Sequence, residues 1–231
     1  MTIAIIGAME PEVAILKQQL QNIVETKISD FIFYSGQLNN KDVVLVQSGI
    51  GKVASTIATT LIIDKFSPEL VINTGSAGGF DPALKVGDIA VANEVVHHDV
   101  DVTAFNYEFG QVPNMPARFV SEKHHVELAE KCINSLSSIT SKVGLIATGD
   151  SFMCDPERIE QTRVRFPDML AVEMEGAAIA QTCYQLKTPF LIIRSLSDIA
   201  GQESPMSFEA YLEVASKNSS ALVSDIVANF E

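Results

Sequence analysis

The sequence predicts one α/β domain over residues 1–231, with three α/β/α layers in which helices flank a central, mixed and twisted sheet. Three observations support this expectation. Short apolar runs, among them 2–7, 70–73 and 190–196, have the composition of buried strands, and helical patterns separate several of them. A hairpin pattern over 31–47 makes the sheet mixed instead of wholly parallel. The chain is long enough for a full core, and no linker divides it.

The first third of the chain alternates strand and helix signals. The run 2–7 ends in Gly7, and Pro11 suits the first turn of a helix that continues to about residue 20. Two strands, 31–38 and 42–47, are joined by Asn39-Asn40, a pair that tolerates positive φ. A helix over 53–66 and a buried strand over 70–73 follow. The glycine-rich stretch 74–79 is expected as the exit from that strand, where backbone can approach a ligand closely.

The rest of the chain continues the pattern around one long irregular segment, residues 97–119. Irregular segments of this length in a compact domain are usually functional or part of an interface. The other elements expected are strands at 86–95, 142–148, 170–172 and 190–196, and helices at 123–136, from 156 to before Pro167, from 176, and at 207–230.

Composition excludes several classes of function. The formal charge of −13 argues against nucleic acid or an anionic membrane as a partner, because both bind basic surfaces. There is no apolar run of membrane-spanning length, and the first residues resemble a strand and not a signal sequence, so we expect a cytoplasmic protein. Cys132, Cys154 and Cys183 have no Cys-x-x-Cys spacing and are expected to be reduced packing residues.

Two local patterns resemble cofactor sites without matching them. The run 97–101, His-His-Asp-Val-Asp, contains metal-ligating residue types at a spacing that fits no established ligand pattern. The run 48–52, Ser-Gly-Ile-Gly-Lys, lacks both the nucleotide-triphosphate and the dinucleotide spacing. We therefore expect neither a metal nor a cofactor.

Polar residues gather where strands turn into helices. Glu173 and Glu175 stand at one such junction, and as an isolated pair they would be interpreted as partners of a helix dipole. Ligands bind at the carboxyl ends of strands in open α/β sheets, so a set of such residues favours a site. The other members of the set are Glu12, Ser76, Arg194 and Asp198. Carboxylates without metal ligands suit cleavage of an N-glycosidic bond, in which one acid protonates the leaving base and another carboxylate activates water.

Seven motifs in order along the chain resemble the 5′-methylthioadenosine/S-adenosylhomocysteine nucleosidases of the nucleoside phosphorylase superfamily. The resemblance covers essentially the whole sequence and implies a nucleoside phosphorylase-like fold. The motifs are Ile-Ile-Gly-Ala-Met-Glu-x-Glu at 5–12, Ser-Gly-Ile-Gly-Lys-Val at 48–53, Asn-Thr-Gly-Ser-Ala-Gly-Gly at 73–79, Asp-x-Asp-Val-Thr-Ala-Phe at 99–105, Thr-Gly-Asp-Ser-Phe at 148–152, Val-Glu-Met-Glu at 172–175 and Arg-x-x-Ser-Asp at 194–198.

The resemblance implies a division of catalytic roles. Asp198 would be the general acid that donates a proton to adenine N7, with Ser197 holding its orientation. Glu12 would hold and deprotonate the attacking water, assisted by Ser76 and Arg194.

It also implies the substrate contacts. Glu175 would accept hydrogen bonds from the ribose 2′- and 3′-hydroxyls, helped by the Met174 backbone, and Phe152 would stack on adenine, whose edge the Met153 backbone contacts. The 5′-alkylthio group would lie in a slot formed by Met9, Ile50, Met174 and Phe208, and Gly78, Glu173 and Ala200 complete the expected substrate-binding set.

The long segment 97–119 gains a role by the same resemblance, which implies a homodimer. Val102, Phe105 and Pro113 would enter the neighbouring subunit's site. Three residues depart from the family pattern: Asn106 for glycine, Phe109 for tyrosine and Pro11 for an acid. None is a proposed catalytic group, although Asn106 bears on the reach of the segment.

Two alternatives stay open at this point. Nucleoside phosphorylases of the same superfamily typically carry a phosphate-binding arginine where this chain has Asn73, which favours water as the nucleophile. A non-catalytic adenosine-binding module would keep the pocket without the chemistry, and the presence of both Glu12 and Asp198 argues against it.

Overall fold

The structure is a computed structural model that describes residues 2–135, 139–201 and 204–230. Helices and strands alternate along most of it. The strands are β1 (Thr2–Gly7), β2 (Gln21–Ile28), β3 (Phe31–Leu38), β4 (Lys41–Gln47), β5 (Leu70–Gly79), β6 (Ile89–His97), β7 (Phe119–Val120), β8 (Ser141–Thr148), β9 (Met169–Glu173) and β10 (Phe190–Ile199). The helices are α1 (Glu10–Gln19), α2 (Lys52–Phe66), η1 (Thr103–Phe105), α3 (Lys123–Ser135), α4 (Pro156–Arg165), α5 (Gly176–Leu186) and α6 (Ser204–Asn229).

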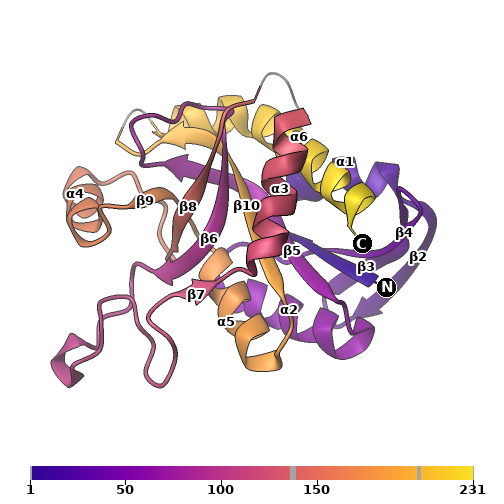
Figure 1. The fold of residues 1–231 in the computed structure, drawn as a ribbon, viewed down its shortest axis with the longest axis horizontal. Coiled ribbons are helices and arrows are strands. Elements are labelled where there is room, and N and C mark those ends of the chain that lie inside the picture. The colour runs from indigo at the N-terminus through magenta and orange to yellow at the C-terminus, as the bar shows by residue number, and fades with distance from the viewer. Residues whose placement is uncertain (1, 136–138, 202–203, 231) are drawn as a thin grey trace.

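Helices cover both faces of the sheet (Figure 1). Apolar residues of α2 and α5, including Ile62 and Ile179, join one buried cluster with one face of the strands. Residues of α1, α3 and α6, including Leu16 and Ile226, join a second cluster on the opposite face. The central strands β1, β5 and β10 are buried along nearly their whole length, as their continuous apolar runs require. The predicted three-layer α/β/α architecture is confirmed.

The sheet is mixed and closes on itself at one end. β1 lies between β4 and β5 and is parallel to both, and β4, β3 and β2 continue antiparallel to the edge. On the other side, β5 pairs with both β9 and β10, and β9, β8, β6 and β10 complete a ring of paired strands. The predicted hairpin is present, with Asn39 and Asn40 both at positive φ.

Two strands, β5 and β10, are longer than the sequence indicated, and two, β2 and the two-residue β7, were missed. The stretch 74–79 is not an exit loop but the second half of β5, and β10 continues to Ile199. These halves pair in parallel, so that Asp198 lies beside Gly78 in the ladder. Gly78 and Gly79 permit this close pairing, because side chains of β9 and β10 occupy the space that a Cβ would need at these positions. Strand β2 escaped prediction because it is a mostly exposed edge strand without an apolar alternation.

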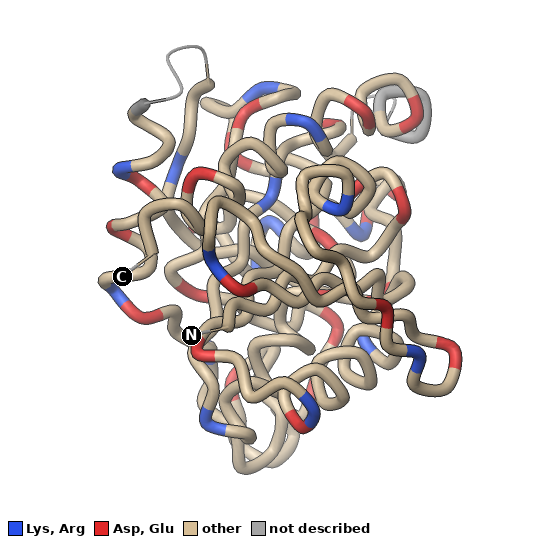
Figure 2. The backbone as a smooth tube through the Cα atoms, turned by 90° about the vertical axis from the view of Figure 1, so that its right-hand side faces the viewer, with Lys and Arg blue, Asp and Glu red and all other residues tan. Residues whose placement is uncertain are grey.

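Charged residues of both signs are distributed along the chain. Figure 2 shows Lys and Arg interspersed with Asp and Glu along the backbone in that view. The segment 97–119 contains η1 and projects away from the sheet at the lower left of Figure 1. Cys132, Cys154 and Cys183 are thiols. Across the described ranges, no helix combines the length and the apolarity needed to span a bilayer.

Candidate active site

One cavity of about 360 Å³ opens where β1, β5, β9 and β10 end. Most of the site residues expected from the sequence line it. They are Met9, Glu12, Ile50, Ser76, Gly78, Phe152, Glu173, Met174, Glu175, Ser197, Asp198 and Phe208; Ala8, Ala77 and Val172 complete the wall. Four carboxyl groups from α1, β9, β10 and the start of α5 therefore face one space.

Glu12 occupies the third position of α1 and reaches back over the start of the helix. Its Oε2 accepts hydrogen bonds from the backbone N–H groups of Ala8 at 2.8 Å and Met9 at 3.0 Å, as a glutamate at this position of a capping box does. Its Oε1 accepts from the Ser76 N–H at 2.9 Å and Oγ at 3.0 Å. All four acceptor positions of the carboxylate are occupied, so the group is fixed in orientation although it lines the cavity.

Asp198 lies at the far end of β10 and is 2% exposed. Ser197 Oγ donates to its Oδ1 at 3.0 Å, which fixes the plane of the carboxyl group. Its Oδ2 lies 3.2 Å from the position that a Cβ on Gly78 would occupy. The glycine in β5 therefore leaves room for the Asp198 carboxyl group.

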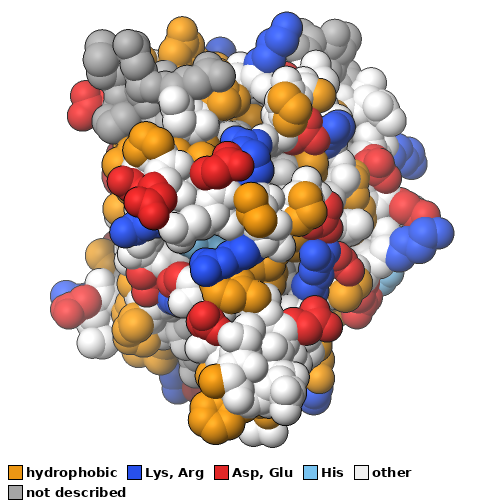
Figure 3. All heavy atoms as spheres, turned by 90° about the vertical axis from the view of Figure 1, so that its left-hand side faces the viewer, with side chains coloured by type: hydrophobic (Ala, Val, Ile, Leu, Met, Phe, Trp, Pro, Cys, Tyr) orange, Lys and Arg blue, Asp and Glu red, His pale blue; other side chains and the backbone are white. Residues whose placement is uncertain are grey.

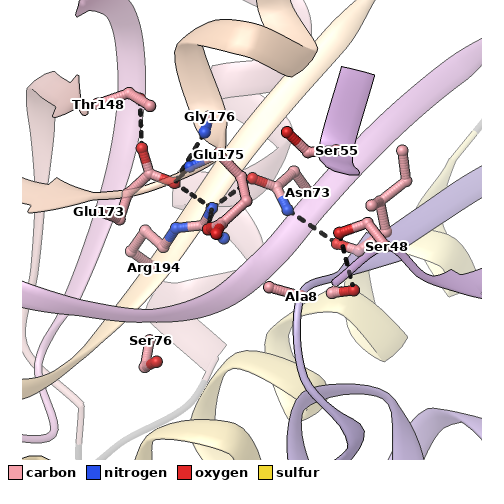
Figure 4. Close-up of polar contacts among 12 residues, drawn as sticks. Ala8, Ser48, Ser55, Asn73, Ser76, Thr148, Glu173, Glu175, Gly176 and Arg194 are labelled. Atoms are coloured by element: carbon pink, nitrogen blue, oxygen red, sulfur yellow. Dashed lines mark hydrogen bonds and ion pairs between the residues drawn. The ribbon is translucent and has the colours of Figure 1, made fainter. Parts of the chain in front are cut away.

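Glu173 is the centre of a buried polar network (Figure 4). It accepts hydrogen bonds from the Thr148 hydroxyl and from Arg194 Nη2, and its Oε2 also accepts from the N–H groups of Glu175 at 3.0 Å and Gly176 at 2.8 Å. The last two are at the N-terminus of α5, so Glu173 does act as a partner of that helix terminus. Burial alone would raise the pKa of Glu173, but Arg194 and these donors outweigh it and hold the pKa below its usual value.

Glu175 differs from Glu173 although only one residue separates them. Its Oε1 accepts from the Gly51 N–H at 2.8 Å, and its Oε2 lies 3.6 Å from Arg194 Nη2. Burial, reinforced by the negative charge of Glu173, raises the pKa of Glu175 to about 7. Of the two carboxyl groups, Glu173 accepts the hydrogen bond from Arg194, and Glu175 remains available to bind a ligand.

The remaining wall is apolar. The rings of Phe152 and Phe208 meet edge to face with centroids 5.8 Å apart, and Ile50 is 56% exposed at the rim. A smaller hollow of about 40 Å³ adjoins the cavity and includes Ser151 and Met153. A flat apolar ring with a polar edge fits such a wall.

Several expected residues lie elsewhere. Arg194 is 1% exposed and is not part of the cavity wall; its side chain contacts Glu173, Glu175, Asn73 and the Ile193 carbonyl. Ala200 directly follows β10, and its N–H donates to Gly79 O. Val102, Phe105 and Pro113 belong to the projecting segment 97–119 and do not line the cavity of their own chain.

Other polar residues of the site had no role assigned from the sequence. Thr148 and Asn73 are fully buried and hold Glu173 and Arg194, and the Gly51 N–H holds Glu175. All three residues belong to motifs that resemble the nucleosidase family. Membership in these motifs was the one feature of the sequence that could have identified them. Among the residues the structure describes, the group with metal-ligand spacing is Glu122, His124 and His125, none of which lines the cavity.

Comparison with known proteins places the chain. A model of the phosphorylase superfamily matches residues 2–228, so the chain belongs to that superfamily, as its fold and its cavity at the strand ends indicate. A 5′-methylthioadenosine/S-adenosylhomocysteine nucleosidase of Pseudoalteromonas translucida is 64% identical over 223 residues, which cover 96% of this chain and 95% of that protein. A second, from Tolumonas auensis, is 59% identical over 96% of this chain and 97% of its own. The chain belongs to this nucleosidase family.

Solved structures of this nucleosidase family have the same fold as this chain. The nucleosidase of Colwellia psychrerythraea 34H in complex with adenine superimposes with a TM-score of 0.97 at 57% identity, covering 98% of this chain and 94% of that one. The Neisseria meningitidis enzyme in complex with methylthio-immucillin-A gives 0.97 at 46% identity, with 99% of both chains covered. A futalosine hydrolase of Helicobacter pylori gives 0.92 at 36% identity, covering 98% and 97%, and represents a related branch.

Proposed function

We propose that this protein hydrolyses the N-glycosidic bond of 5′-methylthioadenosine and S-adenosylhomocysteine, and also of 5′-deoxyadenosine, to give adenine and the 5-substituted ribose. The observation that carries the proposal is that Glu12 and Asp198, held by separate sets of hydrogen bonds, line the same cavity. Relatives at up to 64% identity bear the name of this activity and support the substrate class. Such an activity serves methionine salvage and the removal of S-adenosylmethionine by-products.

The chemistry requires one proton to reach the base and one to leave water. Asp198 donates its proton to adenine N7 as the C1′–N9 bond breaks, and the ribose acquires oxocarbenium character. Water attacks C1′ and gives its proton to Glu12. Because Ser76 Oγ donates to Glu12 Oε1, rotation of this hydroxyl frees the acceptor position that the water needs. Arg194 contributes by holding Glu173 and Glu175.

The proposed nucleophile is water and not phosphate. Asn73, at the position where phosphorylases typically carry an arginine, is fully buried; its Nδ2 donates to Ile6 O at 2.9 Å and its Oδ1 accepts from Arg194. Lysine and arginine are absent from the described cavity wall, whereas four carboxyl groups are present. A wall of this charge repels an anion and suits a cationic transition state.

An adenine-release assay tests the proposal. We expect release from 5′-methylthioadenosine, S-adenosylhomocysteine and 5′-deoxyadenosine in phosphate-free buffer, with free methylthioribose as the second product of the first. A strict requirement for phosphate, with a ribose 1-phosphate product, would identify a phosphorylase. Tight binding without adenine release would identify a non-catalytic adenosine-binding module.

We also infer a cytoplasmic homodimer in which segment 97–119 reaches the neighbouring cavity. Phe105 in this segment is 74% exposed, and Val53, Ile57 and Tyr184 on α2 and α5 are also exposed. Figure 3 shows apolar side chains among charged ones at the surface of the face it presents. Light scattering should give twice the chain mass, and Phe105→Ala should raise KM for 5′-methylthioadenosine. A monomer with unchanged KM would contradict the inference.

A further inference from the structure

The first turn of α2 is shared by two carboxylates from other parts of the chain. The Gly51 N–H donates to Glu175 Oε1 at 2.8 Å, and the next N–H, that of Lys52, donates to Asp150 Oδ1 at 2.8 Å. The N–H groups of a first helical turn have no partner within the helix and carry a partial positive charge. Glu175 lines the cavity and Asp150 does not.

Asp150 is itself held in place. Its N–H donates to Asp99 Oδ2 at 3.0 Å, and Asp99 Oδ1 accepts from Lys52 Nζ at 2.7 Å. Lys52, Asp99 and Asp150 thus form a closed circuit, here named the Lys52 clasp, that joins α2 to the segments following β6 and β8. The side chains of Lys52 and Asp99 are only 22% and 28% exposed, so the ion pair is more shielded than a typical surface pair.

Gly51 is the residue on which the clasp acts. Its φ of +94° favours glycine, and a Cβ there would lie 3.0 Å from Asp150 Oδ1. As the N-cap of α2 it has no side chain, so α2 takes its cap from Asp150. The Gly51 and Lys52 N–H groups belong to adjacent peptide units that meet at the Gly51 Cα, so holding the Lys52 N–H restricts the movement of the Gly51 N–H.

We propose that Asp150 and Asp99 are positioning residues for ribose recognition, because the clasp holds the Gly51 N–H on Glu175. Glu175 then keeps the orientation in which it meets the ribose hydroxyls. The inference rests on the proposed function and extends it to two residues outside the cavity wall.

Pairs of substrates that differ in one hydroxyl test the proposal. In Asp150→Ala we expect kcat/KM for 5′-methylthioadenosine to fall about tenfold, the scale of one hydrogen bond to a charged group. The loss should be smaller for the 2′-deoxy and 3′-deoxy forms, which lack a partner for Glu175. The ratio of kcat/KM for 5′-methylthioadenosine to kcat/KM for a deoxy form should therefore move toward the value of this ratio in Glu175→Gln. The substrates differ in intrinsic reactivity, but this difference cancels because the ratio in each variant is compared with the ratio in the native enzyme.

Asp99→Asn provides a second variant that leaves the Lys52 N–H its cap. It removes the charge paired with Lys52, and the ratio should shift in the same direction by a smaller factor. This variant decides the question if Asp150→Ala does not fold.

Two matched controls separate positioning from stability. Asp155→Ala removes the cap of α4, where Asp155 Oδ1 accepts from the Arg158 N–H at 2.8 Å. Asp81→Asn breaks an ion pair with Lys142 at 2.6 Å and weakens an acceptor of the Ala83 N–H. Neither residue lines the cavity, so both controls should keep the native substrate ratio.

Unchanged ratios in Asp150→Ala and Asp99→Asn, or equal losses on all substrates, would overturn the positioning role. Native enzyme that releases no adenine from any substrate would instead overturn the proposed function. The two failures are therefore distinguishable in one set of assays.

Discussion

Arg194 lies between the carboxylates of Glu173 and Glu175, donating to the first and lying 3.6 Å from the second (Figure 4). Removing one partner of a buried pair leaves an uncompensated charge, which costs ~3–5 kcal/mol. Arg194→Met should lower the free energy of unfolding by this amount. Glu173→Gln should cost less, because Glu175 remains as a partner for the arginine. Denaturant unfolding at neutral pH measures both.

Arg118 provides the control for this buried pair. It contacts Asp168 at 2.7 Å and Glu94 at 2.9 Å, but the side chains of Arg118, Glu94 and Asp168 are 32%, 35% and 53% exposed. Exposed pairs contribute ~0–1 kcal/mol, so Arg118→Met should have little effect. Equal losses in Arg118→Met and Arg194→Met would contradict the assignment of Arg194 as the buried charge that holds both glutamates.

Asp198→Asn and Glu12→Gln should each reduce turnover by at least ~10²-fold, the scale for loss of a general acid or base. Ser76→Ala should cost less, since it removes one of four donors to Glu12 and leaves the Ser76 N–H in place. Steady-state adenine release measures the losses, and adenine binding checks that the site is intact. Near-native turnover in either of the first two variants would refute the assigned role.

The sequence predicted correctly those features of the fold that depend on local residue types. Continuous apolar runs identified the buried strands, and Asn39-Asn40 identified the hairpin, because strand burial and turn chemistry are local properties. The resemblance correctly indicated the fold. The composition of the cavity wall followed from it as well, since residues at strand ends must meet once the strand order is known.

Pairing between distant strands left no such local signal. The stretch 74–79 is rich in glycine and predicts a loop, yet it is strand because β10 pairs with it. Gly75 has no side chain because Glu12 fills the space that a Cβ would occupy. The position of Arg194 behind the cavity depends likewise on Asn73 and Glu173, each from another strand. The Lys52 clasp joins segments about 50 residues apart or more, so no spacing reveals it.

Gly75→Ala should act through Glu12. A Cβ at this position would lie 2.7 Å from Glu12 Oε1, so the carboxylate must move. Misplacement by about 1 Å costs up to ~10²-fold in rate, and we expect a turnover near that of Glu12→Gln. Gly144→Ala is the control, because its Cβ would meet Leu170 Cδ1 at 2.9 Å, outside the cavity wall. Equal turnover in both variants would contradict the expectation.

The pKa of Glu175 predicts a pH dependence of stability. The charged groups that act on it are Glu173 and Glu12, which with burial raise its pKa to about 7, and Arg194, which with the Gly51 N–H opposes them. A carboxyl with a raised pKa binds its proton more tightly in the folded than in the unfolded protein. Its contribution to stability is complete below the unfolded pKa, is lost progressively as the pH rises from there, and is gone once the pH has risen through about 7.

Glu175→Gln stays neutral at every pH and should not undergo this loss. The free energy of unfolding of the variant minus that of the native protein should therefore increase steadily from pH 5 to about pH 7 and level off by pH 8. Urea unfolding at intervals across this range measures the difference, in which the titration of groups common to both proteins largely cancels. Glu157→Gln, on the exposed side of α4, is the control and should give a flat difference. A flat difference for Glu175→Gln as well would mean that Glu175 is already ionised at pH 5 and that Arg194 neutralises both glutamates.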